Sequence, residues 1–191
     1  MVPYPLRLFL LLGLVLHKGV WEVLKRRDHV DRTPRPSSTP AVVLIKFAKI
    51  TMLAGLCAQT VLPEVLPILF EPMPLRLAGG LLFATGLAVA ITARFQLGRQ
   101  WSNIECSSVG ADPKVIEYGV YRFIRHPIYT GDLLLIAGLE LALNSWLVLG
   151  VIPLALAVFF KAKSEEQQLA HRLSGYHEYQ SRTKRFLPFV I

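Results

Sequence analysis

Long apolar runs separated by short polar segments recur along the whole of this chain. The first three cover residues 6–24, 41–62 and 75–97. Each is close to the ~20 residues that a helix needs to cross the ~30 Å hydrocarbon core of a bilayer. Hydrophobic residues make up 53% and charged residues 18% of the chain, and the mean hydropathy is +0.45, which is more apolar than an ordinary soluble domain. The sequence therefore predicts an all-α integral membrane protein.

Two shorter apolar runs, residues 133–143 and 146–160, follow in the C-terminal half and are separated only by Asn144-Ser145. So short a break predicts a tight helical hairpin. Each arm is near or below the ~17–25 residues usually needed to span a bilayer. We therefore expect the hairpin to tilt, to cross incompletely or to borrow flanking residues such as Ile128 and Tyr129. Together with the first three runs this predicts about five transmembrane helices.

The first and third runs have features of their own. The basic cluster Lys25-Arg26-Arg27 follows the first run, whereas a signal peptide carries its basic residues before the apolar core. We therefore expect a retained helix. The third run is rich in small residues, which let membrane helices approach closely, so we expect it to lie centrally in the bundle. These residues are Ala78, Gly79, Gly80, Ala84, Gly86, Ala88 and Ala90.

Charge asymmetry predicts the orientation. The segment between the first two runs carries Lys25, Arg26, Arg27, Arg32 and Arg35, whereas residues 63–74 carry two glutamates and no Lys or Arg. Basic segments face the cytoplasm, so the loop after residue 97 and the C-terminal tail are expected there too. The sequence thus divides into residues 1–97, with three N-terminal transmembrane helices, and residues 98–191, with the hairpin and a cytoplasmic helical tail.

The net charge of +8 does not indicate nucleic-acid binding. The cations lie in short clusters between apolar runs, an arrangement typical of segments that face anionic membrane lipids. Cys57 lies in an apolar run and Cys106 in a polar loop, so neither a disulfide framework nor a CxxC metal site is predicted. The sequence indicates membrane lipids as partners and gives no sign of a metal or of an obligate protein partner.

A dense polar cluster, residues 119–131, directly precedes the hairpin and contains two arginines, a histidine and two tyrosines. Ionisable groups at a membrane boundary suggest a functional site. The alternative is an interfacial belt of aromatic and basic residues. Pro127 favours the site, because proline at a helix start fixes the backbone and would hold His126 and Tyr129 in a defined geometry. The tail carries Glu165 and Glu166, for which a surface amphipathic helix is the alternative.

The motifs of the C-terminal half resemble those of the isoprenylcysteine carboxyl methyltransferase family and its phospholipid methyltransferase relatives. The resemblance runs from about residue 101 to residue 188 and is carried by the order and spacing of four motifs. They are Gly119-Val120-Tyr121, Arg125-His126-Pro127-x-Tyr129-x-Gly131, Glu165-Glu166-x-x-Leu169 and Tyr176-x-x-Tyr179-x-x-x-Thr183-x-Arg185-x-x-Pro188.

The resemblance implies a membrane enzyme whose C-terminal half, residues 98–191, is the methyltransferase region and binds S-adenosylmethionine. The cofactor-binding positions that it implies are Pro113, Lys114, Val115, Ile116, Tyr121, His126, Pro127, Ile128, Tyr129 and Glu165. Arg125, Lys161 or Arg185 would orient an anionic acceptor. The chain departs from the family pattern at Pro113, where a histidine is usual, and at Lys161, where prenylcysteine enzymes carry an arginine.

The activity implied is methyl transfer to a lipid-like or prenylated acceptor, most simply the carboxylate of an isoprenylcysteine-type substrate. An in-line displacement of this kind needs alignment more than acid–base help. Three alternatives stay open at this point: N-methylation of a phospholipid amine, an NADPH-dependent steroid or isoprenoid reductase, and a membrane scaffold without enzymatic activity.

Overall fold

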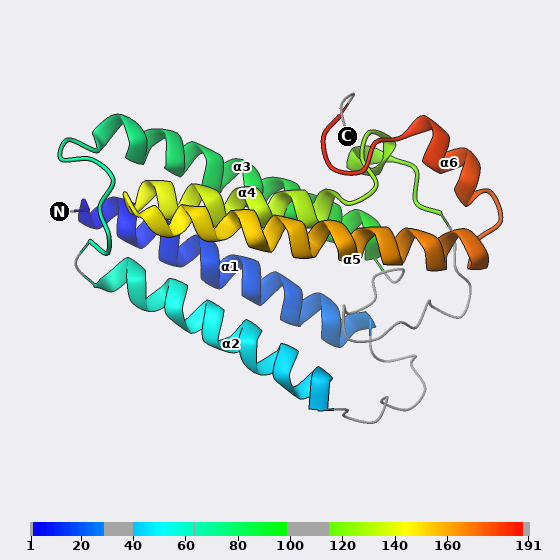
Figure 1. The fold of residues 1–191 in the computed structure, drawn as a ribbon, viewed down its shortest axis with the longest axis horizontal. Coiled ribbons are helices and arrows are strands. Elements are labelled where there is room, and N and C mark those ends of the chain that lie inside the picture. Colours follow the sequence, from blue (N-terminus) through cyan, green and yellow to red (C-terminus); the bar gives the residue numbers. More distant parts are fainter. Residues whose placement is uncertain (1, 29–39, 63, 99–114, 189–191) are drawn as a thin grey trace.

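The computed structural model describes residues 2–28, 40–62, 64–98 and 115–188. Five long helices form an up-and-down bundle (Figure 1): α1 (Tyr4–Asp28), α2 (Pro40–Val61), α3 (Met73–Leu97), α4 (Pro127–Ala142) and α5 (Val151–Arg172). Two short 3-10 helices, η2 (Gly119–Arg122) and η3 (Trp146–Gly150), precede α4 and α5, and α6 (Tyr176–Arg182) follows α5. Within the described ranges, β pairing is limited to two isolated bridges. The predicted all-α architecture is confirmed.

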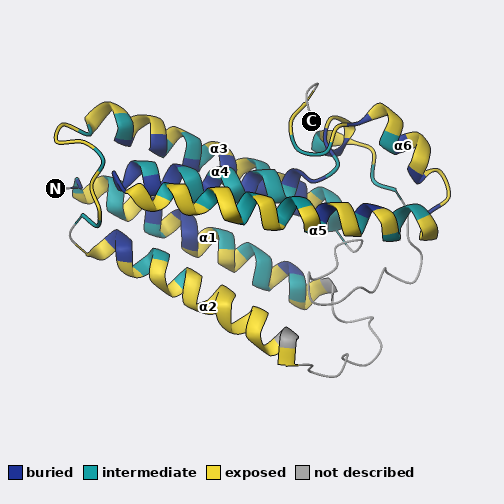
Figure 2. Cartoon of the chain, viewed as in Figure 1, coloured by how far each residue is buried: buried dark blue, intermediate teal, exposed yellow. Residues whose placement is uncertain are grey.

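In the described part of the chain, three helical segments are long and apolar enough to cross a membrane: Val43–Val61, Met73–Leu97 and Trp146–Arg172. The third joins η3 to α5 into one span. α4 has only 16 residues and lies beside them in the bundle, as expected for a short hairpin arm. Most of α2 is exposed (Figure 2). Apart from Lys46, Lys49 and Thr51, its exposed residues are apolar, so most of this surface suits contact with lipid.

Close contact between α3 and α4 defines the centre of the bundle. Glycines on both helices make it possible, because a Cβ atom added at Gly138 would lie 2.2 Å from the backbone nitrogen of Phe83. A Cβ added at Gly86 would lie 2.4 Å from the nitrogen of Leu135. Membrane helices gain packing by this kind of backbone approach. The small residues of the third apolar run therefore serve the central position that the sequence predicted.

The hairpin between α4 and α5 is anchored at the end of the bundle where the N-terminus lies (Figure 1). Asn144 adopts a positive φ of 60°, a conformation that asparagine tolerates better than most residues. Its side chain accepts a hydrogen bond from Leu69 N at 3.0 Å and donates to Leu69 O at 2.9 Å. Beside it, Gln59 donates to the buried Glu140 at 2.8 Å. The Asn144 bonds connect the α2–α3 connection to the hairpin turn, and the Gln59 bond connects α2 to α4 close to that turn.

Candidate functional site

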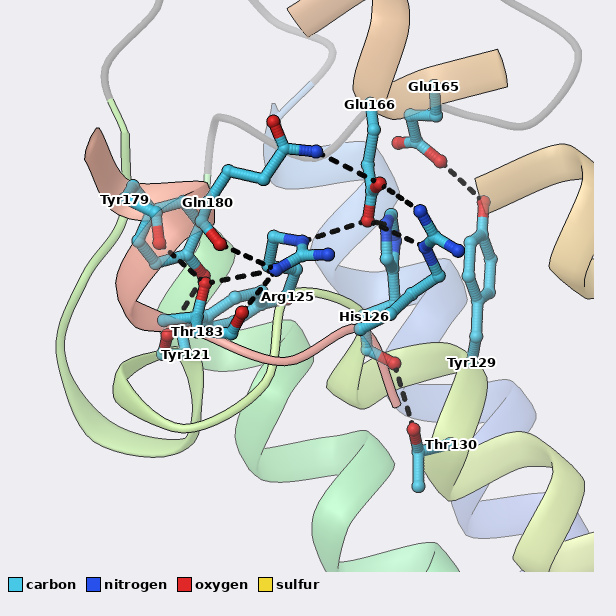
Figure 3. Close-up of polar contacts among 11 residues, drawn as sticks. Tyr121, Arg125, His126, Tyr129, Thr130, Glu165, Glu166, Tyr179, Gln180 and Thr183 are labelled. Carbon is cyan, nitrogen blue, oxygen red and sulfur yellow. Dashed lines mark hydrogen bonds and ion pairs between the residues drawn. The ribbon is translucent and has the colours of Figure 1, made fainter. Parts of the chain in front are cut away.

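The opposite end of the bundle gathers the polar residues that the motifs singled out (Figure 3). The chain after α6 returns as an extended segment and pairs with the residues that precede α4. Arg125 N donates to Lys184 O at 2.8 Å, His126 N donates to Arg185 O at 3.1 Å, and Lys184 N donates to Phe123 O at 3.2 Å. This pairing brings together residues almost sixty positions apart in the sequence.

His126 is held at the start of α4. It is the N-cap residue, and Pro127 occupies the first helical position, where its fixed φ suits the helix. The carbonyl of His126 accepts hydrogen bonds from the backbone nitrogen and the hydroxyl of Thr130, at 3.1 and 3.2 Å. The His126 side chain is buried. The His-Pro pair therefore marks the start of α4, and His126 is fixed there by its backbone contacts.

Glu166 lies at the centre of a cluster of polar contacts. We call Glu166 and its partners Arg125, His126, Gln180 and Arg185 the Glu166 hub. Its Oε1 accepts hydrogen bonds from Arg125 Nε at 2.9 Å and from Arg185 Nε at 3.0 Å, and lies 3.2 Å from His126 Nε2. Its Oε2 accepts from Arg185 Nη2 at 2.7 Å and from Gln180 Nε2 at 3.4 Å. Only 3% of Glu166 is exposed. One buried carboxylate thus ties α5 to the start of α4 and to the tail.

Glu165 occupies a different environment from its neighbour. It is half-buried and accepts one hydrogen bond, at 2.9 Å, from the hydroxyl of Tyr129. The rings of His126 and Tyr129 stack with their centroids 5.4 Å apart and an interplanar angle of 10°. A carboxylate and an aromatic face therefore meet next to the Glu166 hub, which fixes His126 from the other side (Figure 3).

Two tyrosines close the site toward η2 and α6. The hydroxyl of Tyr179 donates to the carbonyl of Tyr121 at 2.8 Å, and both side chains are buried. Burial raises the pKa of each phenol well above its ordinary value, because a buried phenolate would lose its hydration. Arg125 supports the same region by donating through Nη1 to the carbonyl oxygens of Gln180, at 3.1 Å, and of Thr183.

The predicted residues fall into three groups. Tyr121, His126, Tyr129 and Glu165, with the buried Pro127 and the half-buried Ile128, come together at the site. Val115 packs against the cluster of Leu173, Tyr176 and Tyr179, and Ile116, next to it in the chain, is half-buried. Pro113 and Lys114 lie outside the described residues.

The three cations predicted to orient an acceptor differ in their contacts. Arg125 and Arg185 are both bonded to Glu166, and the Arg185 guanidinium also lies 5.1 Å from the centroid of the Phe159 ring. The hydrogen bonds to Glu166 raise the pKa of Arg185 above its ordinary value. Lys161 is half-buried on α5, one helical turn before Glu165, and pairs with none of the described residues.

Sequence reasoning did not assign Glu166, Gln180 or Thr183 to the site. The sequence carried only a weak signal for Glu166: Ala162 and Glu166 lie one helical turn apart and are the buried residues of α5. A small residue one turn before a carboxylate leaves room for long partner side chains. The partners themselves come from segments that only the fold brings near.

The donor set fits S-adenosylmethionine. That cofactor carries a positively charged sulfonium, an ammonium group and ribose hydroxyls, all of which suit a carboxylate such as Glu165. The sulfonium also suits the aromatic face of Tyr129, since cations are attracted to aromatic rings. In the part of the chain that the structure describes, no group of three or more His, Cys, Asp or Glu residues could hold a metal ion.

Comparison with known proteins shows the family of the chain. Residues 75–174, more than half of the chain, match the phospholipid methyltransferase family. The chain belongs to the phospholipid methyltransferase family. The matched region of this family member includes α3, the polar cluster 119–131, the hairpin and both glutamates of α5. The resemblance predicted from the motifs is thereby confirmed.

The chain is also similar to one curated protein in sequence and to one solved structure in fold. The cobalt-zinc-cadmium resistance protein CzcN of Cupriavidus metallidurans is 33% identical over 94 residues, which cover 48% of this chain and 43% of CzcN. The eukaryotic intramembrane Ras methyltransferase ICMT, an isoprenylcysteine carboxyl methyltransferase, has a similar structure, with a TM-score of 0.57 and 21% identity. The likeness covers 92% of this chain and 63% of ICMT. The chain thus spans less than two thirds of the length of either protein, and its fold is similar to that of ICMT.

Proposed function

We propose that this chain is a membrane methyltransferase that uses S-adenosylmethionine and acts on a lipid-like acceptor. The observation that carries the proposal is the pair formed by Glu165 and Tyr129, 2.9 Å apart, beside a buried Glu166 that holds His126 in place. Membership of the phospholipid methyltransferase family supports the same activity. In this proposal residues 98–191 are the methyltransferase region and residues 1–97 are its membrane support.

When bound, S-adenosylmethionine supplies the methyl group on a sulfonium cation. We assign the binding of a polar or cationic part of the cofactor to Glu165, because its carboxylate is half-buried and, among the described residues, has a single hydrogen bond, to a neutral partner. His126 and Tyr129 supply a stacked aromatic wall, and Tyr121 closes the side toward η2. Glu166 does not need to touch the cofactor, since its own partners already surround it.

For the acceptor we propose the carboxylate of an isoprenylcysteine-type substrate, with Lys161 as the cation that orients it. Arg125 and Arg185 form ion pairs with Glu166. In this structure their guanidinium groups are therefore engaged with Glu166, and they affect an acceptor only indirectly, by holding the Glu166 hub in place. Lys161 lies four residues before Glu165 on α5, about 5–6 Å along the helix. An acceptor carboxylate is ionised at neutral pH, so the chain's task is to align the reacting atoms.

The site end of the bundle is proposed to face the cytoplasm. The last turn of α1 carries Lys25, Arg26 and Arg27 and lies at this end (Figure 1), whereas the connection between α2 and α3 carries Glu64 and Glu71 without Lys or Arg. This asymmetry follows the positive-inside rule. A fluorescent reporter fused to the C-terminus should be active in the cytoplasm. A periplasmic reporter active at the same position would reverse the assignment.

Binding and transfer can be tested separately. Calorimetry of the full chain in detergent should show binding of S-adenosylmethionine and none of NADPH. Glu165→Gln should weaken cofactor binding roughly ten- to hundred-fold, whereas the matched control Glu71→Gln, on an exposed loop at the other end of the bundle, should leave it unchanged. If Glu165→Gln bound the cofactor with wild-type affinity, the Glu165 carboxylate would not be part of the cofactor site.

The acceptor is tested with a labelled methyl group and mass spectrometry of the products. Label on a farnesylcysteine analogue, with a raised KM in Lys161→Gln and an unchanged cofactor affinity, is the expected result. Label on a phospholipid amine instead would reassign the acceptor while leaving the methyltransferase proposal intact. Absence of label from every lipid fraction, together with absence of cofactor binding, would overturn the proposed activity.

A further inference from the structure

A small surface pocket lies beside the site and has no part in the proposed chemistry. Its volume is about 180 Å³, and it is lined by Arg122, Phe123, Arg182, Lys184 and Pro188. Three of these five residues are cations. Pockets that enclose drug-sized ligands measure about 300–1,000 Å³, so this one suits a single compact group better than a whole nucleotide.

The positive charge of the pocket is only partly balanced. Arg182 Nη2 lies 3.0 Å from Glu117 Oε2 and 3.7 Å from Glu178 Oε1. The side chains of Arg122 and Lys184 are exposed and pair with none of the residues that the structure describes. Two cations therefore face the pocket without a counter-charge, which favours an anionic ligand.

Backbone pairing separates this pocket from the Glu166 hub. The segment after α6 is extended, and successive side chains of an extended segment point to opposite sides. Thr183 is buried and Arg185 bonds to Glu166, whereas Lys184, between them, is exposed and lines the pocket. The hub and the pocket therefore occupy opposite sides of one segment, and a ligand in the pocket would contact the tail without reaching Glu166.

Apolar side chains beside the cations indicate that the anion belongs to a lipid headgroup. Phe123 is 49% exposed and Leu187 is 46% exposed, although both are large and apolar. Phe123 lies four residues before Pro127, where α4 begins. This surface therefore lies next to the end of the helical bundle at which α4 starts. Exposed aromatic and aliphatic groups mixed with cations are typical of surfaces that rest on lipid headgroups.

We propose that this pocket binds the phosphate of an anionic lipid headgroup, with Arg122 and Lys184 as its main ligands and Phe123 and Leu187 resting against the lipid. Binding there would hold the segment 183–188 at the membrane surface. Because Arg185 belongs to the same segment and bonds to Glu166, the lipid would also steady the hub. The proposal does not depend on the methyltransferase activity.

The test is native mass spectrometry of the full chain released from mixed micelles that contain equal amounts of phosphatidylglycerol and phosphatidylcholine. The wild type should retain phosphatidylglycerol preferentially. Arg122→Gln and Lys184→Gln should each weaken that retention about five-fold, as expected for one cation near a lipid phosphate. The matched control is Lys163→Gln, an exposed lysine of α5 outside the pocket, and it should behave as the wild type.

Two results would overturn the proposal. One is equal retention of phosphatidylglycerol by the wild type and both pocket variants. The other is complete displacement of the lipid by millimolar inorganic phosphate, which would assign the pocket to a free anion. Thermal unfolding of each variant checks folding, and because the substituted side chains are exposed we expect midpoints like that of the wild type. Calorimetry with S-adenosylmethionine on the same samples tests the proposed activity independently.

Discussion

Replacing Glu166 by Gln should destabilise the C-terminal region more than any other single isosteric change at the site. The substitution keeps the shape of the side chain and removes its charge. In the wild type, 3% of Glu166 is exposed, and the carboxylate faces the guanidinium groups of Arg125 at 2.9 Å and Arg185 at 2.7 Å. Without the carboxylate, two largely buried cations lose their shared counter-charge.

The expected magnitude follows from that geometry. Removing one partner from a buried ion pair costs about 3–5 kcal/mol, because the remaining charge stays buried without compensation. For a chain of about 150–250 residues, each kcal/mol lowers the unfolding midpoint by about 2–4 °C. The midpoint of Glu166→Gln should therefore fall by roughly 6–20 °C. The tail should also become more sensitive to proteases, because Gln180 and Arg185 both attach it to α5 through Glu166.

The assay is thermal unfolding in detergent, followed by circular dichroism, with Glu165→Gln as the matched control. Glu165 is only half-buried and has one hydrogen bond, so its substitution should cost about 0.5–1.5 kcal/mol. Adding Arg185→Gln to Glu166→Gln should recover part of the loss, because the double variant leaves one fewer unpaired cation. Midpoints for Glu166→Gln and Glu165→Gln within about 2 °C of each other would refute the reasoning, since 2 °C is at most about 1 kcal/mol here.

Three further changes have defined outcomes. Gly138→Ala should lower the free energy of unfolding by about 1–3 kcal/mol in a denaturant titration, because the new methyl group would meet the α3 backbone, whereas Gly55→Ala, in open space, should not. Asn144→Ala should speed proteolysis of the α2–α3 connection, since both of its side-chain bonds to Leu69 are lost; an unchanged cleavage rate would contradict this role. Tyr179 has a pKa raised by burial, so its contribution to stability is complete below about pH 10 and is lost as the pH rises further. Tyrosinate absorbance should therefore appear together with unfolding of the tail, and Tyr179→Phe should make the alkaline unfolding less steep.

The sequence predicted the position of His126 because its determinants are local. Proline restricts both its own φ and the conformation of the residue before it, so the start of α4 at Pro127 follows from His-Pro itself. The break at Asn144-Ser145 is equally local, since it lies between two apolar runs that are each too long to be a turn. In both cases the residues that decide the structure are within a few positions of it.

The two glutamates of α5 show where sequence reasoning stopped. Successive residues on a helix point about 100° apart, so only one of Glu165 and Glu166 can face the bundle fully. The resemblance of the motifs assigned Glu165 to the site, whereas Ala162 and Glu166 are the buried residues. Polar and apolar residues occur on both sides of this part of the helix, so the pattern alone did not fix which side is buried.

The sequence by itself determined the class of this protein: a helical membrane chain with a polar cluster at the start of a hairpin and a pair of acidic residues after it. Apolar runs and proline act over one helix length or less, so they can be read from the chain directly. Only the tertiary structure decided that Glu166 is the hub. Its partner Arg185 lies nineteen positions later and reaches it through a turn at Gly175, which has a φ of 83°. Hydrogen bonds across such distances depend on where the backbone returns, and that is set by the packing of the whole bundle.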